Sequence, residues 1–140
     1  MDKSKILLKF KNLPTQDIQL YGSLCLKAYC EQKELSHPAI FELLNHLGMM
    51  HSSKNLPEWD SKGALLALNG RGDDIPTDLE DMLIQKKSTD FTSLVDNVVE
   101  IGIVDLYEEK TNLPIQFLER ALAILEKNNT PLPLPNKQLS

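Results

Sequence analysis

The stretch from residue 89 to residue 109 constrains the fold most, because its apolar side chains repeat with the period of an α-helix. The apolar residues on one side of this helix are Phe91, Leu94, Val95, Val98, Val99 and Ile101. The polar residues on the other side are Asp90, Ser93, Asp96, Asn97 and Glu100. A helix with such a wide apolar stripe has to bury it against neighbours. The pattern changes at Gly102, so we expect a kink, a bulge or a break near it, or else a helix surrounded by neighbours.

Prolines and glycines divide the rest of the chain into short helices. We expect helices over about 15–34, 38–48, 57–70, 77–87 and 113–127, several with a proline in the first turn. The expected N-caps are Thr15, Thr77 (in a capping box with Glu80), Thr89 and Asn112. The expected inward face of the second of these helices consists of Ile40, Phe41, Leu44 and Leu47. Residues 3–11 fit a strand and a short helix equally well.

These elements predict an all-α fold, an irregular bundle of about six or seven short helices. Its central hairpin pairs residues 89–109 with residues 113–127. A small β element near the N-terminus is the main structural alternative. Residues 1–128 are expected to form one helical domain, which at this size folds without disulfides or metals. Residues 129–140 are expected to be a Pro-rich extended tail, because Thr130-Pro131-Leu132-Pro133-Leu134-Pro135 cannot be helical.

The sequence also predicts where the protein works. No stretch approaches the ~20 apolar residues of a membrane span, and the apolar run Ile6-Leu7-Leu8 is too short for a secretory signal. Cys25 and Cys30 are five apart, a spacing that does not let them bridge on one helix. We therefore expect a cytoplasmic protein in a reducing compartment, without contact to a membrane.

The negative charge is concentrated in the middle of the chain. The net charge is −5, but residues 51–110 carry six Lys/Arg and thirteen Asp/Glu, while the segments on either side are each close to neutral. A nucleic-acid binder would show a basic stripe instead. An acidic block favours steering of a basic partner, although it is equally typical of a face that only keeps a protein in solution.

Motifs for catalysis and metal binding are missing from the sequence. His37, His46 and His51 lack the spacing of metal ligands on one helix face, and no phosphate loop or nucleophile elbow occurs. Glu100 and Asp105 are the only carboxylates between Val98 and Tyr107, so partial burial could make a general acid or base of them. We favour a surface Glu100 and an Asp105 that caps a helix break. We expect no enzyme activity, no cofactor, no metal and no small-molecule substrate.

Trp59 is the only tryptophan and stands between Glu58 and Asp60. Tryptophan is enriched at binding hot spots, so an acidic-rimmed Trp59 could anchor a partner. The alternative is a core tryptophan at the start of a helix.

In size, acidity, helical content and lack of catalytic motifs, the chain resembles bacterial immunity proteins encoded beside toxins of contact-dependent inhibition systems. The segment SKGALLALNGRGDDIPTDLEDMLIQKKSTDFTSLVDNVVEIGIVDLYEEK contributes most to this likeness. The resemblance implies a cognate toxin, often a basic nuclease, whose active site or substrate surface is covered. On the charge argument, the residues expected to contact it are Glu58, Trp59, Asp60, Asp73, Asp74, Asp78, Glu80, Asp81, Asp96 and Glu100.

Two other classes of function stay open. One is an adaptor that binds partners through a helical groove or the Leu-Pro tail. The other is an enzyme of unfamiliar type that uses Glu100 or Asp105.

Overall fold

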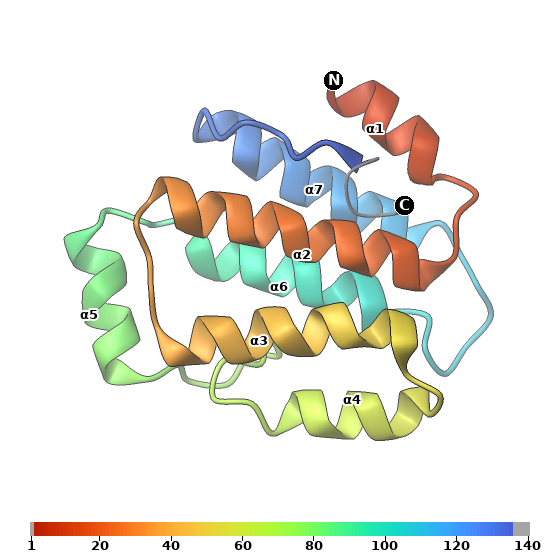
Figure 1. Cartoon of the computed structure of the whole chain (residues 1–140), viewed down its shortest axis with the longest axis horizontal. Coiled ribbons are helices and arrows are strands. Elements are labelled where there is room, and N and C mark those ends of the chain that lie inside the picture. The colour runs from red at the N-terminus through yellow and green to blue at the C-terminus, as the bar shows by residue number, and fades with distance from the viewer. Residues whose placement is uncertain (1, 136–140) are drawn as a thin grey trace.

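Seven α-helices follow one another in the computed structural model, which describes residues 2–135 (Figure 1). The helices are α1 (Lys3–Phe10), α2 (Thr15–Gln32), α3 (Pro38–Met49), α4 (Leu56–Ala64), α5 (Thr77–Gln85), α6 (Phe91–Ile103) and α7 (Leu113–Lys127). A 3-10 turn, η1 (Met50–Ser52), follows α3. No strand occurs in the described residues, and the predicted all-α bundle is confirmed. None of the described helices is long and apolar enough to cross a bilayer.

The ambiguous N-terminal segment is helix α1, so the β alternative is wrong. The Asp2 carboxylate caps it by accepting a hydrogen bond from the backbone N–H of Lys5 at 2.9 Å. Ile6 and Phe10, four residues apart, are fully buried on one face. The Phe10 ring lies 4.8 Å from that of Tyr21 on α2, which fixes α1 against the bundle.

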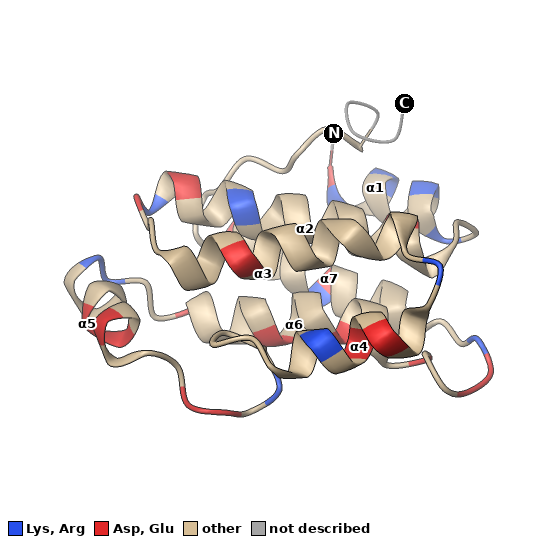
Figure 2. Cartoon of the chain, turned by 60° about the horizontal axis from the view of Figure 1, so that its bottom comes forward, with Lys and Arg blue, Asp and Glu red and all other residues tan. Residues whose placement is uncertain are grey.

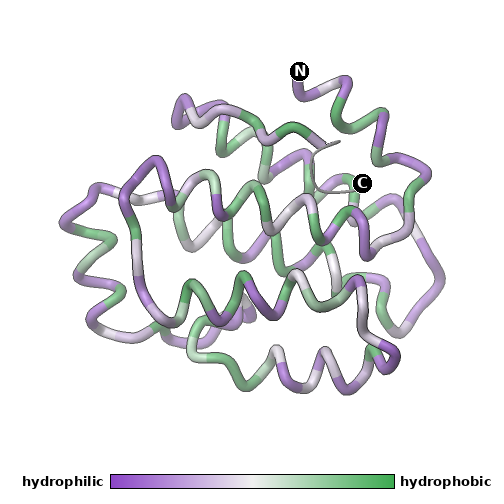
Figure 3. The backbone as a smooth tube through the Cα atoms, viewed as in Figure 1, coloured by the Kyte–Doolittle hydropathy of each residue, from purple (hydrophilic) through white to green (hydrophobic). Residues whose placement is uncertain are grey.

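The centre of the bundle is α2 together with the hairpin of α6 and α7. These three helices pack against one another, α3 packs on α2, and α1 and α5 lie at opposite ends of the molecule (Figure 1). The predicted break at Gly102 is confirmed, since α6 ends at Ile103. Hydrophobic and hydrophilic residues alternate along every helix, as Figure 3 shows, and each helix contributes to one buried cluster.

Three of the predicted caps are wrong. Thr15 and Thr77 are the first residues inside their helices, because Pro14 and Pro76 take the N-cap positions with extended ψ angles. Thr89 is displaced by Asp90, and neither side chain makes a cap hydrogen bond. Asn112 is the N-cap of α7 as predicted, but its side chain makes no cap hydrogen bond. The Leu113 N–H in the first turn donates instead to the Thr111 hydroxyl, at 3.0 Å.

The inward faces of α3 and α4 differ from the prediction. Helix α2 packs on one side of α3, and the buried residues there are Ala39, Ile40, Leu43 and Leu47. Phe41, which was expected on this side, is 59% exposed. The helix also continues past Gly48. Helix α4 ends at Ala64 instead of Gly70, and Leu65 just beyond it is 86% exposed.

The Pro-rich segment lies against α2. The Tyr21 hydroxyl donates a 2.7 Å hydrogen bond to the carbonyl of Pro133, and the Gln32 amide donates to the carbonyl of Asn129 at 3.1 Å. Thr130 is buried and Leu132 packs on the core. Residues 136–140 of the predicted tail lie outside the described residues.

Candidate functional site

Four of the predicted acidic residues surround two adjoining hollows, which we call the acidic hollow. Asp73 and Asp74 come from the loop after α4, Glu80 from α5 and Asp96 from α6. The larger part measures about 590 Å³ and is lined by Asp73, Asp74 and Glu80. The smaller part, about 110 Å³, lies between Asp73 and Asp96. Apolar side chains line both parts: Ile75, Leu83, Leu68 and Val95.

The loop that carries Asp73 is held by Asn69, which is nearly fully buried. Its side-chain amide donates to the Asp73 carboxylate at 2.7 Å and to the carbonyl of Ala64 at 3.2 Å. Its side-chain oxygen accepts from the backbone N–H of Arg71 at 2.9 Å. Gly70 has a φ of +67°, and a Cβ there would lie 2.6 Å from Val99 of α6. A glycine is therefore required for the loop to lie this close to α6.

Arg71 binds the loop to α4. Its guanidinium forms a 2.8 Å ion pair with the Asp60 carboxylate and donates to the Asp60 carbonyl at 3.1 Å. The Tyr107 hydroxyl donates to the same carboxylate at 2.8 Å. The charge of Asp60 is thus neutralised within the protein, and Asp60 acts as an attachment point for the loop.

Asp96 and Glu100 are acidic residues in an environment that disfavours their charge. Partial burial raises the pKa of Glu100; the Arg71 guanidinium opposes this shift and the Asp96 carboxylate adds to it. Burial also raises the pKa of Asp96. Both carboxylates would gain from a cation that a partner brought to them.

Most of the predicted acidic residues form no ion pair with another described residue. Among residues 2–135, no Lys, Arg or His nitrogen lies within 4.0 Å of Asp73, Asp74, Glu80, Asp81, Asp96 or Glu100. Figure 2 shows acidic segments on α5, on the loop that precedes it, on α6 and on α4 along one side. Lysines gather on α1 at the other end of the molecule: Lys3, Lys5 and Lys9, with Lys11 just after it.

Asp78 is instead paired with His37. The His37 ring accepts the backbone N–H of Ala39 through Nδ1 at 3.0 Å, so the proton sits on Nε2, which lies 3.0 Å from Asp78. This hydrogen bond lowers the pKa of Asp78. It also joins the first turns of α3 and α5, which positions α5 and its exposed residues Glu80 and Asp81.

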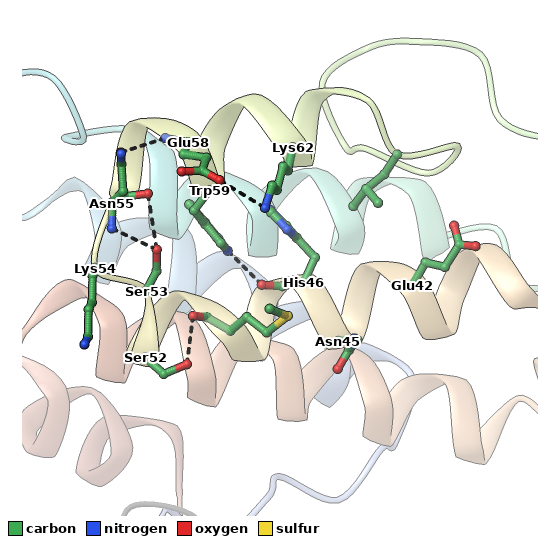
Figure 4. Close-up of a pocket in the computed structure, with 12 residues that line it drawn as sticks. Glu42, Asn45, His46, Ser52, Ser53, Lys54, Asn55, Glu58, Trp59 and Lys62 are labelled. Atoms are coloured by element: carbon green, nitrogen blue, oxygen red, sulfur yellow. Dashed lines mark hydrogen bonds and ion pairs between the residues drawn. The ribbon is translucent and has the colours of Figure 1, made fainter.

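Glu58 and Trp59 belong to a different surface, the groove between α3 and α4 (Figure 4). Trp59 is only 5% exposed, as the core interpretation expects. Its ring stacks on His46, with centroids 4.6 Å apart, and its Nε1 donates to the His46 carbonyl at 2.8 Å. Burial, and secondly Arg71, lower the pKa of His46, which keeps the ring neutral.

Sequence reasoning missed the α3 wall of this groove, formed by Glu42, Asn45, His46 and Met49. Their spacing places them together on the side of α3 turned from the core. This spacing could have predicted a second exposed face on α3. The prediction failed because it placed Phe41 and Leu44 on the buried face of the helix.

Glu100 and Asp105 are not brought together as a catalytic pair. Both Asp105 oxygens accept hydrogen bonds from Thr111, at 2.7 Å from its backbone N–H and 2.9 Å from its hydroxyl. Asp105 thus closes the turn between α6 and α7, but its side chain caps neither helix. Glu100 is half-buried and not the surface residue that was expected, and the Arg71 guanidinium affects its pKa. In the described part of the chain, no three His, Cys, Asp or Glu side chains are arranged to hold a metal ion.

Comparison of the chain with protein-family models, with curated proteins and with solved structures found no match.

Proposed function

We propose that the protein is an immunity-type inhibitor that binds a basic protein toxin and covers its active site or substrate surface with the acidic hollow. The observation that carries the proposal is the set of carboxylates around the hollow, which converge from three segments without a cationic partner in the described residues. A protein that only needed solubility would gain nothing from placing them around one concavity.

The hollow suits lysine and arginine side chains of a partner. Ile75 and Leu83 offer apolar contacts to an aliphatic stem, while Asp73, Asp74 and Glu80 can accept hydrogen bonds from its cationic head. A nuclease presents such side chains where it holds phosphates. An inhibitor that engages them excludes the substrate without needing chemistry of its own.

The proposal predicts that a gene next to that of this chain encodes a large secreted protein with a toxic C-terminal domain. The test is co-expression of the chain with that domain. The hollow variant carries Asp73→Asn, Asp74→Asn, Glu80→Gln and Asp96→Asn. The control variant removes the same charge from exposed sites elsewhere, through Glu31→Gln, Glu108→Gln, Glu109→Gln and Glu119→Gln.

We expect the wild type and the control variant to restore growth, and the hollow variant to fail while still folding by circular dichroism. Equal rescue by both variants would show that the hollow is not the interface. No rescue and no complex at 0.05 M salt with the wild type would refute the inhibitor function itself.

A further inference from the structure

The α3–α4 groove is a second concave surface, distinct in chemistry from the acidic hollow. It has a volume of about 520 Å³, in the range of ligand-binding sites. Its apolar part is formed by the Trp59–His46 stack, which Figure 4 shows, together with the lining residues Met49 and Leu66. Met49 is 54% exposed, so its side chain is available for contact.

Opposite charges at the two ends of the groove distinguish one end from the other. In the middle, Glu58 and Lys62 neutralise each other through a 3.2 Å ion pair. Glu42 lies at one end and Lys54 at the other, as Figure 4 shows, and neither has an ion-pair partner among residues 2–135. Among the described residues, the Glu42 end of the groove therefore carries an unpaired negative charge and the Lys54 end an unpaired positive charge. The neutralised Glu58–Lys62 pair, the polar Asn45 and the apolar side chains lie between them.

The carboxamide of Asn45 lies between the two ends and makes no hydrogen bond within the described residues. It offers one acceptor and two donor hydrogens. Extended backbone needs such partners, because its N–H and C=O groups are not paired along the chain. A helix satisfies its own backbone and would leave Asn45 unused.

The length of the groove also fits an extended segment. Glu42 and Met49 are seven residues apart on one helix, which is about 10 Å along its axis. An extended chain advances about 3.3 Å per residue, so about three residues would run from Glu42 to Met49, and the segment would continue past Met49 to Lys54.

From the charges, the free carboxamide and the length, we propose that the α3–α4 groove binds an extended peptide segment of a partner protein. The segment places a basic residue at Glu42, a large apolar side chain against Met49 and Trp59, and an acidic residue at Lys54. This inference does not depend on the acidic hollow, since a peptide can occupy the groove whether or not a toxin binds the hollow.

The experiment selects random seven-residue peptides displayed on phage against the immobilised full chain. Synthetic peptides of the enriched sequences, without tryptophan, are then titrated while the fluorescence of Trp59 is followed. Trp59 is the only tryptophan in the chain, so its signal reports on the groove. We expect enriched peptides with a basic residue, an apolar residue and an acidic residue in a fixed order.

Variants test both the location of the peptide site and the direction in which the peptide lies. Met49→Ser should weaken the selected peptides at least tenfold. Leu8→Ser, which changes an even more exposed apolar residue on α1, should not. The double variant Glu42→Lys with Lys54→Glu should prefer peptides with the charges reversed.

The proposal is wrong if no peptide is enriched, or if the enriched peptides bind Met49→Ser as tightly as the wild type. It is also wrong if bound peptides become helical by circular dichroism, or if sedimentation shows a dimer that Met49→Ser dissociates, since a helix or a second copy would then be the occupant.

Discussion

Two helical glycines differ in what a methyl group would meet. A Cβ at Gly102 would collide with the side-chain oxygen of Gln19 and lie 3.1 Å from the Trp59 ring, whereas a Cβ at Gly48 would meet nothing within 4 Å. We expect Gly102→Ala to lower the free energy of unfolding by about 1–3 kcal/mol through overpacking. Gly48→Ala should raise it by about 0.5–1 kcal/mol, because alanine favours a helix. Urea unfolding measures both, and a Gly102→Ala protein as stable as the wild type would contradict the close approach of α2 and α6.

Glu100 is predicted to cost stability at neutral pH. Because burial raises its pKa, the folded state holds the proton more tightly than the unfolded chain does. The free energy of unfolding should therefore gain from this group as pH falls from neutrality through the folded-state pKa. Glu100→Gln should stabilise the protein at pH 7 by up to about 0.5 kcal/mol and remove this part of the pH dependence.

Urea unfolding at pH 7 and pH 5 tests the prediction, with the exposed Glu109→Gln as the control. A loss of stability at pH 7 in Glu100→Gln would mean that the attraction to Arg71 outweighs the cost of burial.

At the scale of helices, the sequence predicted the helix and its buried face most accurately where the apolar residues repeat over a long stretch. The apolar stripe of α6 and its pairing with α7 follow from spacing alone, and so does the break after Gly102. The α1 segment could not be assigned, since Ile6 and Phe10 fit a helix only once α7 and Tyr21 are there to cover them. The rotation of α3 likewise depends on how α2 packs, which local propensity does not determine.

The Pro-rich segment is predicted to stabilise the bundle from outside its helices. Leu132 packs on the core, while Leu134 two residues later is 60% exposed. We expect Leu132→Ala to lower the free energy of unfolding by about 1–2 kcal/mol and Leu134→Ala to change it by no more than about 0.5 kcal/mol. Thermal unfolding of the two variants gives the comparison, and equal stabilities would show that the segment does not support α2.

At the scale of the molecule, the sequence located the acidic block but not its division in space. The loop after α4 lies against α6, and this brings together Asp73, Asp74, Glu80 and Asp96. Asn69 and Gly70 determine the path of the loop, which the distribution of charge along the sequence does not predict. Residues that are adjacent in the sequence have different surroundings. Glu58 and Trp59 line the α3–α4 groove, whereas the charge of Asp60 is neutralised by Arg71.

The proposed complex should depend on salt mainly through its association rate. The screening length is about 8 Å at ~0.15 M salt, so attraction over longer distances is lost as salt rises. Stopped-flow mixing with the toxin domain should show an association rate that falls at least tenfold between 0.05 and 0.5 M salt, with a smaller change in dissociation. A rate independent of salt would mean that the uncompensated carboxylates do not guide the encounter.

The lysines of α1 and the carboxylates of the acidic hollow lie on different parts of the surface, so positive and negative charge are unevenly distributed over the molecule. In the field of a basic surface such a body experiences a torque as well as an attraction. The protein would rotate before contact, so that the lysines of α1 face away from the basic surface and the acidic hollow faces it. Orientation would then be decided during diffusion, and fewer of the first collisions would present the wrong side.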